Sequence, residues 1–386
     1  MAGAGGGGEA GVMKYADEYR DERLVGALLA RMREGAARLP RAVRIMEICG
    51  GHTVVLCRAG VHAVLPEEVQ VVSGPGCPVC VTPRGTVDQA IWLAEQPGVV
   101  VFTFGDMLRV PGERGTLGAY AGREGKVRLM YSALQVVEYA EAHRGETCVL
   151  LGIGFETTAP GIAAAVLRAA ERGVKNLFVL AAGKRTVAAM RALLEDQEVA
   201  LDGFIAPGHV TTVIGARSYE FISAEFGKPC VVAGFEVCDV VDALGRVVEQ
   251  LVAGAARVEI EYTRSATWEG NQKAQAVIAR VFEPCEAEWR GLGRIPASGY
   301  KLRGEFEDFD AVGRLGVPGM SSADPAGCRC GEVLRGVCAP PDCALFGQGC
   351  TPEHPVGPCM VASEGSCAAY YLYGVRARAR GEQKRI

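Results

Sequence analysis

Residues 43–53 read VRIMEICGGHT and pass from an apolar, β-branched run through a glycine turn into an apolar pattern of helical period. Two more runs, Val69–Val72 and Val99–Phe104, end in the same kind of Gly-rich turn. Further runs of this type are Cys148–Ile153, Asn176–Leu180, Gly203–Ile205 and Pro229–Ala233. Short strands that alternate with helices predict βαβ units and parallel sheets covered on both faces.

The chain has 386 residues, which at roughly 150 residues per domain suggests two or three domains. Gly-Phe-Glu recurs at 154–156 and 234–236, each time between an apolar run and a helical pattern, and weakly supports two related halves. We therefore expect an α/β fold of two similar parallel-sheet domains plus a small irregular domain. The expected division is a flexible tail over 1–12, domain I over 13–140, domain II over 141–260 and a C-terminal domain over 261–386.

Charge and hydropathy exclude several classes of function. The 41 Lys and Arg residues are outnumbered by 45 Asp and Glu, so the chain lacks the excess positive charge of a dedicated nucleic-acid binder. No stretch reaches about 18 uninterrupted apolar residues, and no membrane span is expected. The opening MAGAGGGGEAG lacks the apolar core of a secretory signal, so we expect a cytoplasmic protein. In a reducing compartment, the 15 cysteines are metal ligands or catalytic thiols more often than disulfides.

Seven of the cysteines lie between residues 328 and 367, and no two of them form a Cys-x-x-Cys pair. Structural zinc sites usually show two such pairs, because each pair grips the ion from one tight turn. Widely spaced cysteines on proline-interrupted loops suit a larger cofactor with separate corners. We predict an iron–sulfur cluster in this region, with zinc and disulfides as the alternatives.

Turn-rich context selects the expected cluster ligands. They are Cys330, Cys343, Cys350 and Cys367. Cys328 and Cys359 stay as alternates, whereas Cys338 is the least embedded in such context. A bound cluster would also explain how a region of little hydrophobic pattern holds together.

Cys49 stands at the end of the first strand-like run, where parallel α/β sheets bind their ligands. A following helix N-terminus would stabilise its thiolate through the dipole and free N–H groups. Gly50 and Gly51 allow close approach of backbone, and His52 adds an imidazole. Such a thiolate and imidazole could ligate a transition metal or activate a nucleophile, and the alternative is a buried structural cysteine.

Residues 74–80 read GPGCPVC and stand between the run Val69–Val72 and a helical stretch over Gly85–Glu95. A Cys-x-x-Cys pair that opens a helix after a strand is the arrangement of thioredoxin-type dithiols. We predict that Cys77 and Cys80 form a redox-active pair, with half of a zinc site as the alternative.

Three other loops also follow apolar runs, and either functional or structural roles suit them. They are Phe104–Arg109, Gly152–Pro160 and Gly208–Thr211.

Six motifs stand along the chain in a fixed order. They are MEICGGHT (46–53), GPGCPVCVTP (74–83), TFGDMLRVPG (103–112), GFETTAP (154–160), PGHV (207–210) and the cysteine-rich run over 328–371. Together they resemble the HypD family of [NiFe]-hydrogenase maturation proteins, over about residues 15 to 375.

This resemblance implies two similar α/β domains and a third that carries a [4Fe–4S] cluster. It also implies that the protein forms a scaffold with the small chaperone HypC, on which an iron with two cyanides and one carbon monoxide is built. Cyanide would arrive from HypE, with HypF upstream, and the finished Fe(CN)2CO unit would pass to the hydrogenase large-subunit precursor.

The resemblance also assigns roles to residues of this chain. Cys49 falls on the cysteine that holds the iron together with a HypC cysteine, and His52 falls on the histidine of the same motif. Cys77 and Cys80 fall on the redox-active dithiol. By a further resemblance to ferredoxin–thioredoxin reductase, electrons would pass between cluster and dithiol.

A second class of function stays open, namely a freestanding iron–sulfur disulfide reductase. Such an enzyme has no need of Cys49, whereas the scaffold fails without it. Low-spin iron that carries cyanide and carbon monoxide needs a soft thiolate and a pocket shielded from water.

Overall fold

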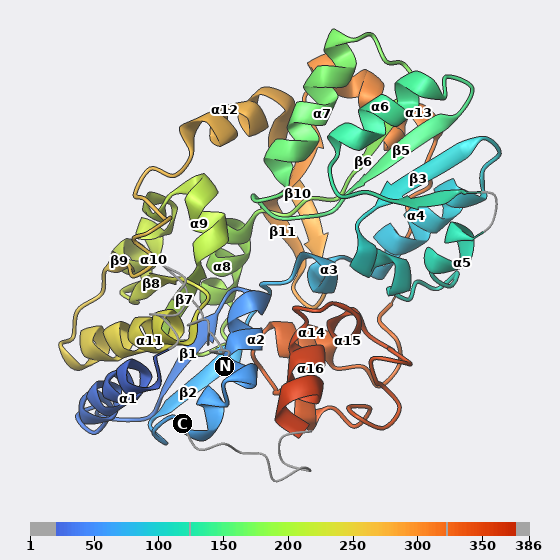
Figure 1. The fold of residues 1–386 in the computed structure, drawn as a ribbon. Helices are drawn as coiled ribbons and strands as arrows, with labels where there is room; N and C mark the ends of the chain where they lie inside the picture. The colour runs from blue at the N-terminus through green and yellow to red at the C-terminus, as the bar shows by residue number, and fades with distance from the viewer. Residues whose placement is uncertain (1–20, 123–124, 322, 376–386) are drawn as a thin grey trace, which may run out of the picture.

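Two parallel sheets form the core of the computed structural model, which describes residues 21–122, 125–321 and 323–375. Sheet A has the order β2 (Val69–Ser73), β1 (Val43–Glu47), β7 (Gly203–Pro207), β8 (Cys230–Ala233), β9 (Val258–Ile260). Sheet B has the order β4 (Val127–Leu129), β3 (Val99–Thr103), β5 (Thr147–Gly152), β6 (Leu177–Ala181). The predicted α/β class with two parallel sheets is confirmed (Figure 1). The expected tail over 1–12 lies outside the described residues.

The chain passes from sheet A to sheet B and back before β7, and after β9 it passes again to the side of sheet B, so the expected boundary at 140 and 141 does not coincide with the division between the sheets. β1 and β2 pair with β7, β8 and β9, whereas β3 to β6 form sheet B. The first crossing, at residues 78–83, contains α3 (Pro78–Val81), and the second lies at residues 182–186. Local apolar runs predict strands but not their partners, which explains the difference.

Helices cover both faces of each sheet. The faces of sheet A pack against α1 (Glu22–Ala36), α2 (Gly50–Arg58) and α11 (Val237–Val252), and against α8 (Thr186–Glu195) and α10 (Glu220–Phe226). The faces of sheet B pack against α6 (Leu134–Ala142), α7 (Ala159–Glu171) and α12 (Gln272–Val281), and against α4 (Arg84–Glu95) and α13 (Ala311–Leu315). Two short helices follow β7 and precede β4, namely α9 (Gly208–Ile214) and α5 (Gly118–Ala121). Within the described part of the chain, no helix has the length and apolar character needed to cross a membrane.

An antiparallel hairpin of β10 (Phe282–Trp289) and β11 (Gly293–Leu302) lies between the sheets in Figure 1. The sequence pattern did not predict this hairpin. The cysteine-rich region that follows contains short helices joined by loops. These helices are α14 (Cys330–Leu334), α15 (Pro358–Val361) and α16 (Ser366–Ala369). The region is irregular, as predicted, and packs beside α2 and α3 (Figure 1).

Each sheet has a topological switch point, where ligands of open α/β sheets bind. In sheet A the chain leaves β1 toward β2 on one side and leaves β7 toward β8 on the other, so the switch point lies between β1 and β7. Cys49 follows β1 and His209 follows β7. The corresponding point in sheet B lies between β3 and β5.

Candidate thiol site

Cys49 caps the N-terminus of α2 at the carboxyl end of β1. The neighbouring loop holds its turn in place, because the N–H of Gly50 donates to the carbonyl of Gly76 at 3.2 Å. A Cβ atom at Gly76 would overlap the Cys49 backbone, and one at Gly50 would overlap the backbone of Glu364. The Cys49 turn therefore packs directly against the loop before Cys77 and against the C-terminal region. At both contacts there is room for glycine but not for a larger residue.

A fully buried carboxyl group, Glu47, lies beneath this turn. Its side chain accepts hydrogen bonds from the Cys49 N–H at 3.0 Å and from the Thr53 hydroxyl. Burial raises the pKa of Glu47 to about 8, although these hydrogen bonds oppose the shift. Sequence reasoning missed this residue; its one signal was an acidic side chain at the end of a strand that is mostly apolar.

Cys49 as a whole is half-buried, and the pKa of its thiol is raised to about 12. Desolvation is the main cause, followed by the carboxyl groups of Glu364 and Glu47. The backbone N–H groups of Gly51 and His52 act in the opposite direction, as expected at a helix N-terminus, but they are outweighed. The free thiolate expected from the sequence is therefore disfavoured, and Cys49 stays a thiol until a cation replaces its proton.

His52 is fully buried and points its Nε2 away from α2, toward the end of β8. This atom lies 2.9 Å from the carbonyl oxygen of Gly234 and 3.3 Å from that of Ala233. The ring stacks on Phe235 at 4.9 Å between centroids. Burial lowers the pKa of His52 to about 4, so the imidazole is neutral, and its Nδ1 has no hydrogen-bond partner among the described residues.

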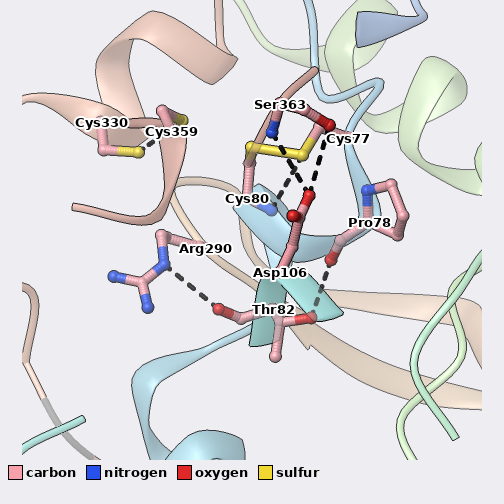
Figure 2. Close-up of a disulfide and its surroundings, with 9 residues drawn as sticks. All are labelled: Cys77, Pro78, Cys80, Thr82, Asp106, Arg290, Cys330, Cys359 and Ser363. Atoms are coloured by element: carbon pink, nitrogen blue, oxygen red, sulfur yellow. Dashed lines mark hydrogen bonds between the residues drawn. A yellow bond between two sulfur atoms is a disulfide. The ribbon is translucent and has the colours of Figure 1, made fainter. Parts of the chain in front are cut away.

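Cys77 and Cys80 form a disulfide at the start of α3 (Figure 2). Both residues are buried, and the Cys80 N–H donates to the Cys77 sulfur at 3.2 Å. Asp106, from the loop after β3, lies beside the disulfide in Figure 2 and accepts a hydrogen bond from the Ser363 N–H at 3.3 Å. Segments from sheet A, sheet B and the C-terminal region thus surround the pair.

Six of the seven C-terminal cysteines line one cavity. They are Cys328, Cys330, Cys343, Cys350, Cys359 and Cys367. All four expected ligands and both alternates therefore face the same cavity, whereas Cys338 does not line it. The remaining wall includes Leu345, Phe346 and Met360.

The cysteines approach one another most closely on one side of this cavity. The sulfurs of Cys330 and Cys359 lie 2.6 Å apart. The pKa of the Cys330 thiol falls well below its usual value, chiefly through hydrogen bonds with Cys328 and Cys359 and to a smaller extent through the charge of Arg290. Among the described residues, no three His, Cys, Asp or Glu side chains gather closely enough to hold a single metal ion.

The disulfide and the cysteine cavity share one apolar cluster. Cys77 and Cys80 pack in it together with Cys330 and Cys359, and also with Trp289. α15, which carries Cys359, contacts α3. The disulfide and two of the cavity thiols therefore belong to one packed apolar cluster.

The other strand-end loops make mainly structural contacts. Glu156 is buried and accepts hydrogen bonds from the N–H and the hydroxyl of Thr186, both at 2.8 Å. Arg109 donates to the Val361 carbonyl at 2.9 Å and so ties the loop after β3 to α15. His209 lies opposite Cys49 across the switch point of sheet A and stacks on Phe235 at 3.9 Å.

The fold and the site together define a class: a two-sheet α/β protein with a lone thiol at one switch point and a disulfide packed against a cysteine-lined cavity. Such an arrangement combines a soft ligand with redox-capable sulfur.

Comparison with known proteins shows the family of the chain. A family model described as "HypD: Hydrogenase formation hypA family" matches residues 23–374. The chain is 44% identical over 370 residues to the hydrogenase maturation factor HypD of Cupriavidus necator, covering 94% of this chain and 97% of that protein. It is 41% identical over 368 residues to HypD of Escherichia coli, covering 94% and 98%. The chain belongs to the HypD family of hydrogenase maturation factors.

Proposed function

We propose that the chain is a scaffold on which the Fe(CN)2CO unit of [NiFe] hydrogenases is assembled, with Cys49 as its ligand to that iron. The observation that carries this proposal is the place of Cys49: a half-buried cysteine at the switch point of sheet A, with Gly76 packed against its backbone. The iron is cargo. Its binding releases the proton that burial otherwise keeps on Cys49.

The surroundings of Cys49 support a shared site. One protein thiolate leaves most iron positions to the cyanides, to carbon monoxide and to a second cysteine, which we assign to HypC. HypE, supplied by HypF, would then deliver cyanide, and the large-subunit precursor would receive the unit through HypC. His52 fixes the turn by donating from Nε2 to Gly234, and its neutral ring adds no charge beside the metal.

We further propose that the C-terminal cavity holds a [4Fe–4S] cluster through Cys330, Cys343, Cys350 and Cys367, with Cys328 and Cys359 as alternates. Soft thiols on several walls of one cavity suit such a group better than a single ion. When bound, the cluster supplies or accepts one electron at a time.

The role of the Cys77–Cys80 pair follows from its position beside the cavity. Reduction of the disulfide takes up two electrons and two protons and yields two thiols, so a one-electron donor of low potential must act twice. The Cys80 N–H stabilises a Cys77 thiolate, which makes Cys77 the thiol that attacks or leaves.

Replacement of Cys49 tests the scaffold. Cys49→Ala should abolish hydrogenase maturation in a complemented strain and leave the visible absorption of the cluster unchanged. The control is Cys57→Ala on the same helix, which removes a buried thiol and should support maturation. Loss of the cluster in Cys49→Ala, or normal maturation by it, would refute the assignment.

The second candidate is an iron–sulfur disulfide reductase, favoured by the shared packing of the disulfide and the cavity. Such an enzyme would turn over a disulfide substrate at an unchanged rate in Cys49→Ala, whereas the scaffold would show no such turnover in either form.

A further inference from the structure

Phe235, in the loop after β8, lies at the centre of a stack of three rings beside the Cys49 turn. Its ring stacks on that of His52 at 4.9 Å between centroids and on that of His209 at 3.9 Å, with an interplanar angle of 25° in both cases. Tyr262 packs edge-on against the same ring at 6.0 Å. Three aromatic neighbours therefore hold the Phe235 ring in one orientation.

The backbone on both sides of Phe235 is held by carboxyl groups from other segments. The Gly234 N–H donates to the side chain of Glu261 at 3.1 Å. The Glu236 N–H donates to the side chain of Asp239 at 3.0 Å, and Asp239 is fully buried. A Cβ atom at Gly234 would overlap the Asp239 carboxyl group, so the loop has no room to shift on that side. The loop therefore keeps the ring at a fixed place.

The absence of a side chain at Gly51 brings this ring and the Cys49 sulfur to one place. A Cβ atom on Gly51 would lie 3.0 Å from Cδ1 of the Phe235 ring and 3.6 Å from the sulfur of Cys49. Gly51 thus leaves a small space that the ring and the sulfur both border. An iron bound to this sulfur therefore has the Phe235 ring as a near neighbour.

Gly-Phe-Glu occurs a second time at residues 154–156, and there too the phenylalanine lies beside sulfur. Phe155 follows β5, is buried and stacks on Trp289 at 6.0 Å between centroids. It belongs to the apolar cluster that contains Cys77 and Cys80. Each copy of the motif therefore places one ring after a parallel strand, one copy beside the disulfide and the other beside the lone thiol.

We propose that Phe235 shields the iron unit on Cys49: its ring forms an apolar wall beside the iron and keeps water from the cyanide and carbon monoxide ligands on that side. This inference rests on the proposed function, since it requires the iron on Cys49. The apolar shell around a metal site controls the access of solvent to it. Because Cys49 is only half-buried, neighbouring side chains have to supply that shell.

The test is infrared spectroscopy of each variant, purified without air together with the HypC partner. Phe235→Ala should keep the cyanide and carbonyl bands but shift and broaden them, because water then forms hydrogen bonds to the cyanide nitrogens in several arrangements. Phe235→Leu keeps an apolar side chain of smaller surface, so its bands should lie between those of the wild type and those of Phe235→Ala. Circular dichroism shows whether each variant is folded.

The matched control is Phe221→Ala on α10, which removes a ring of the same size from a helix that packs on sheet A. The Phe221 ring packs against Phe226 at 6.3 Å and lies beneath the guanidinium of Arg191 at 4.4 Å. The infrared bands of this variant should equal those of the wild type. The same shift in the control would show that it arises from a general loss of packing, and would reject the shield.

Each outcome decides the proposal. Bands in Phe235→Ala at the wild-type positions and widths would overturn it. Absence of the bands from both Phe235 variants would also overturn it, because the residue would then serve to form the site and not to shield it. If Phe235→Ala alone lacks the bands, shifted bands in Phe235→Leu support the proposal and unchanged ones reject it. A wild type without cyanide and carbonyl bands would instead refute the scaffold in the proposed function, before any variant is compared.

Discussion

Cys49 and His52 belong to one short motif, but their surroundings give them different tasks. Both could be selected from the sequence, because a thiol and an imidazole beside two glycines rarely serve packing alone. Their protonation states could not be predicted from the sequence. The helix N-terminus predicts a thiolate, whereas burial and two carboxyl groups keep Cys49 protonated and burial keeps His52 neutral.

Residues that act through burial are the ones that sequence reasoning missed. Glu47 is an ordinary charged residue in the sequence, and only the folded chain shows that it is buried and supports the Cys49 turn. Desolvation depends on contacts from distant segments, which no local pattern contains.

Lys184 gives a prediction about pH. It is 5% exposed, and desolvation lowers its pKa from 10.5 to about 8. Between these values the unfolded chain binds a proton that the folded protein lacks, so stability rises with pH there, by up to about 1.4 kcal/mol per pH unit. Lys184→Met should therefore be more stable than the wild type at pH 7, and its advantage should shrink between pH 8 and 10.

Urea unfolding of both proteins across this range measures the effect. An advantage that stays constant from pH 7 to pH 10 would show that Lys184 is not held in its neutral form by the fold.

At the scale of elements, apolar runs located the seven longer parallel strands to within a residue or two. β4 and β9 were not predicted, because a strand of three residues is too short to show a periodic pattern. Both strands lie at a sheet edge. The hairpin β10–β11 was not predicted because charged residues, prolines and glycines interrupt its apolar residues, so neither strand contains a continuous apolar run.

The loop before the disulfide gives a prediction about packing. Gly76→Ala introduces a Cβ that overlaps the Cys49 backbone, so the two loops must separate. We expect a loss of about 1–3 kcal/mol in the free energy of unfolding, together with loss of iron-unit binding. Gly105→Ala is the control, because a Cβ there meets no atom within 4 Å. Equal stability of the two variants would contradict the close packing of the loops.

The cavity gives a prediction about its cysteines. Cys330→Ser should lower the iron and sulfide content of the anaerobic protein, because Cys330 is buried among the cavity thiols. Cys338→Ser should keep the full content, since Cys338 lies outside the cavity wall. A cluster that survives the first change and not the second would reverse our choice of ligands.

At the scale of the whole molecule, the chain order explains how the parts meet. Because β1 and β2 join sheet A and the next segment enters sheet B, the disulfide lies at the crossing between the two sheets. The C-terminal region then packs against α2 and α3, which brings the cysteine cavity, the disulfide and Cys49 into one neighbourhood. The sequence predicts each part separately, but the pairing of distant strands that unites them is a long-range property.

The central claim is that Cys49 holds an iron bearing cyanide and carbon monoxide. Infrared spectroscopy of the protein, purified without air together with its HypC partner, tests it most directly. We predict bands in the cyanide and carbonyl stretching regions that disappear in Cys49→Ala and persist in Cys57→Ala. A spectrum without such bands in the wild type, or with the same bands in Cys49→Ala, would contradict the account.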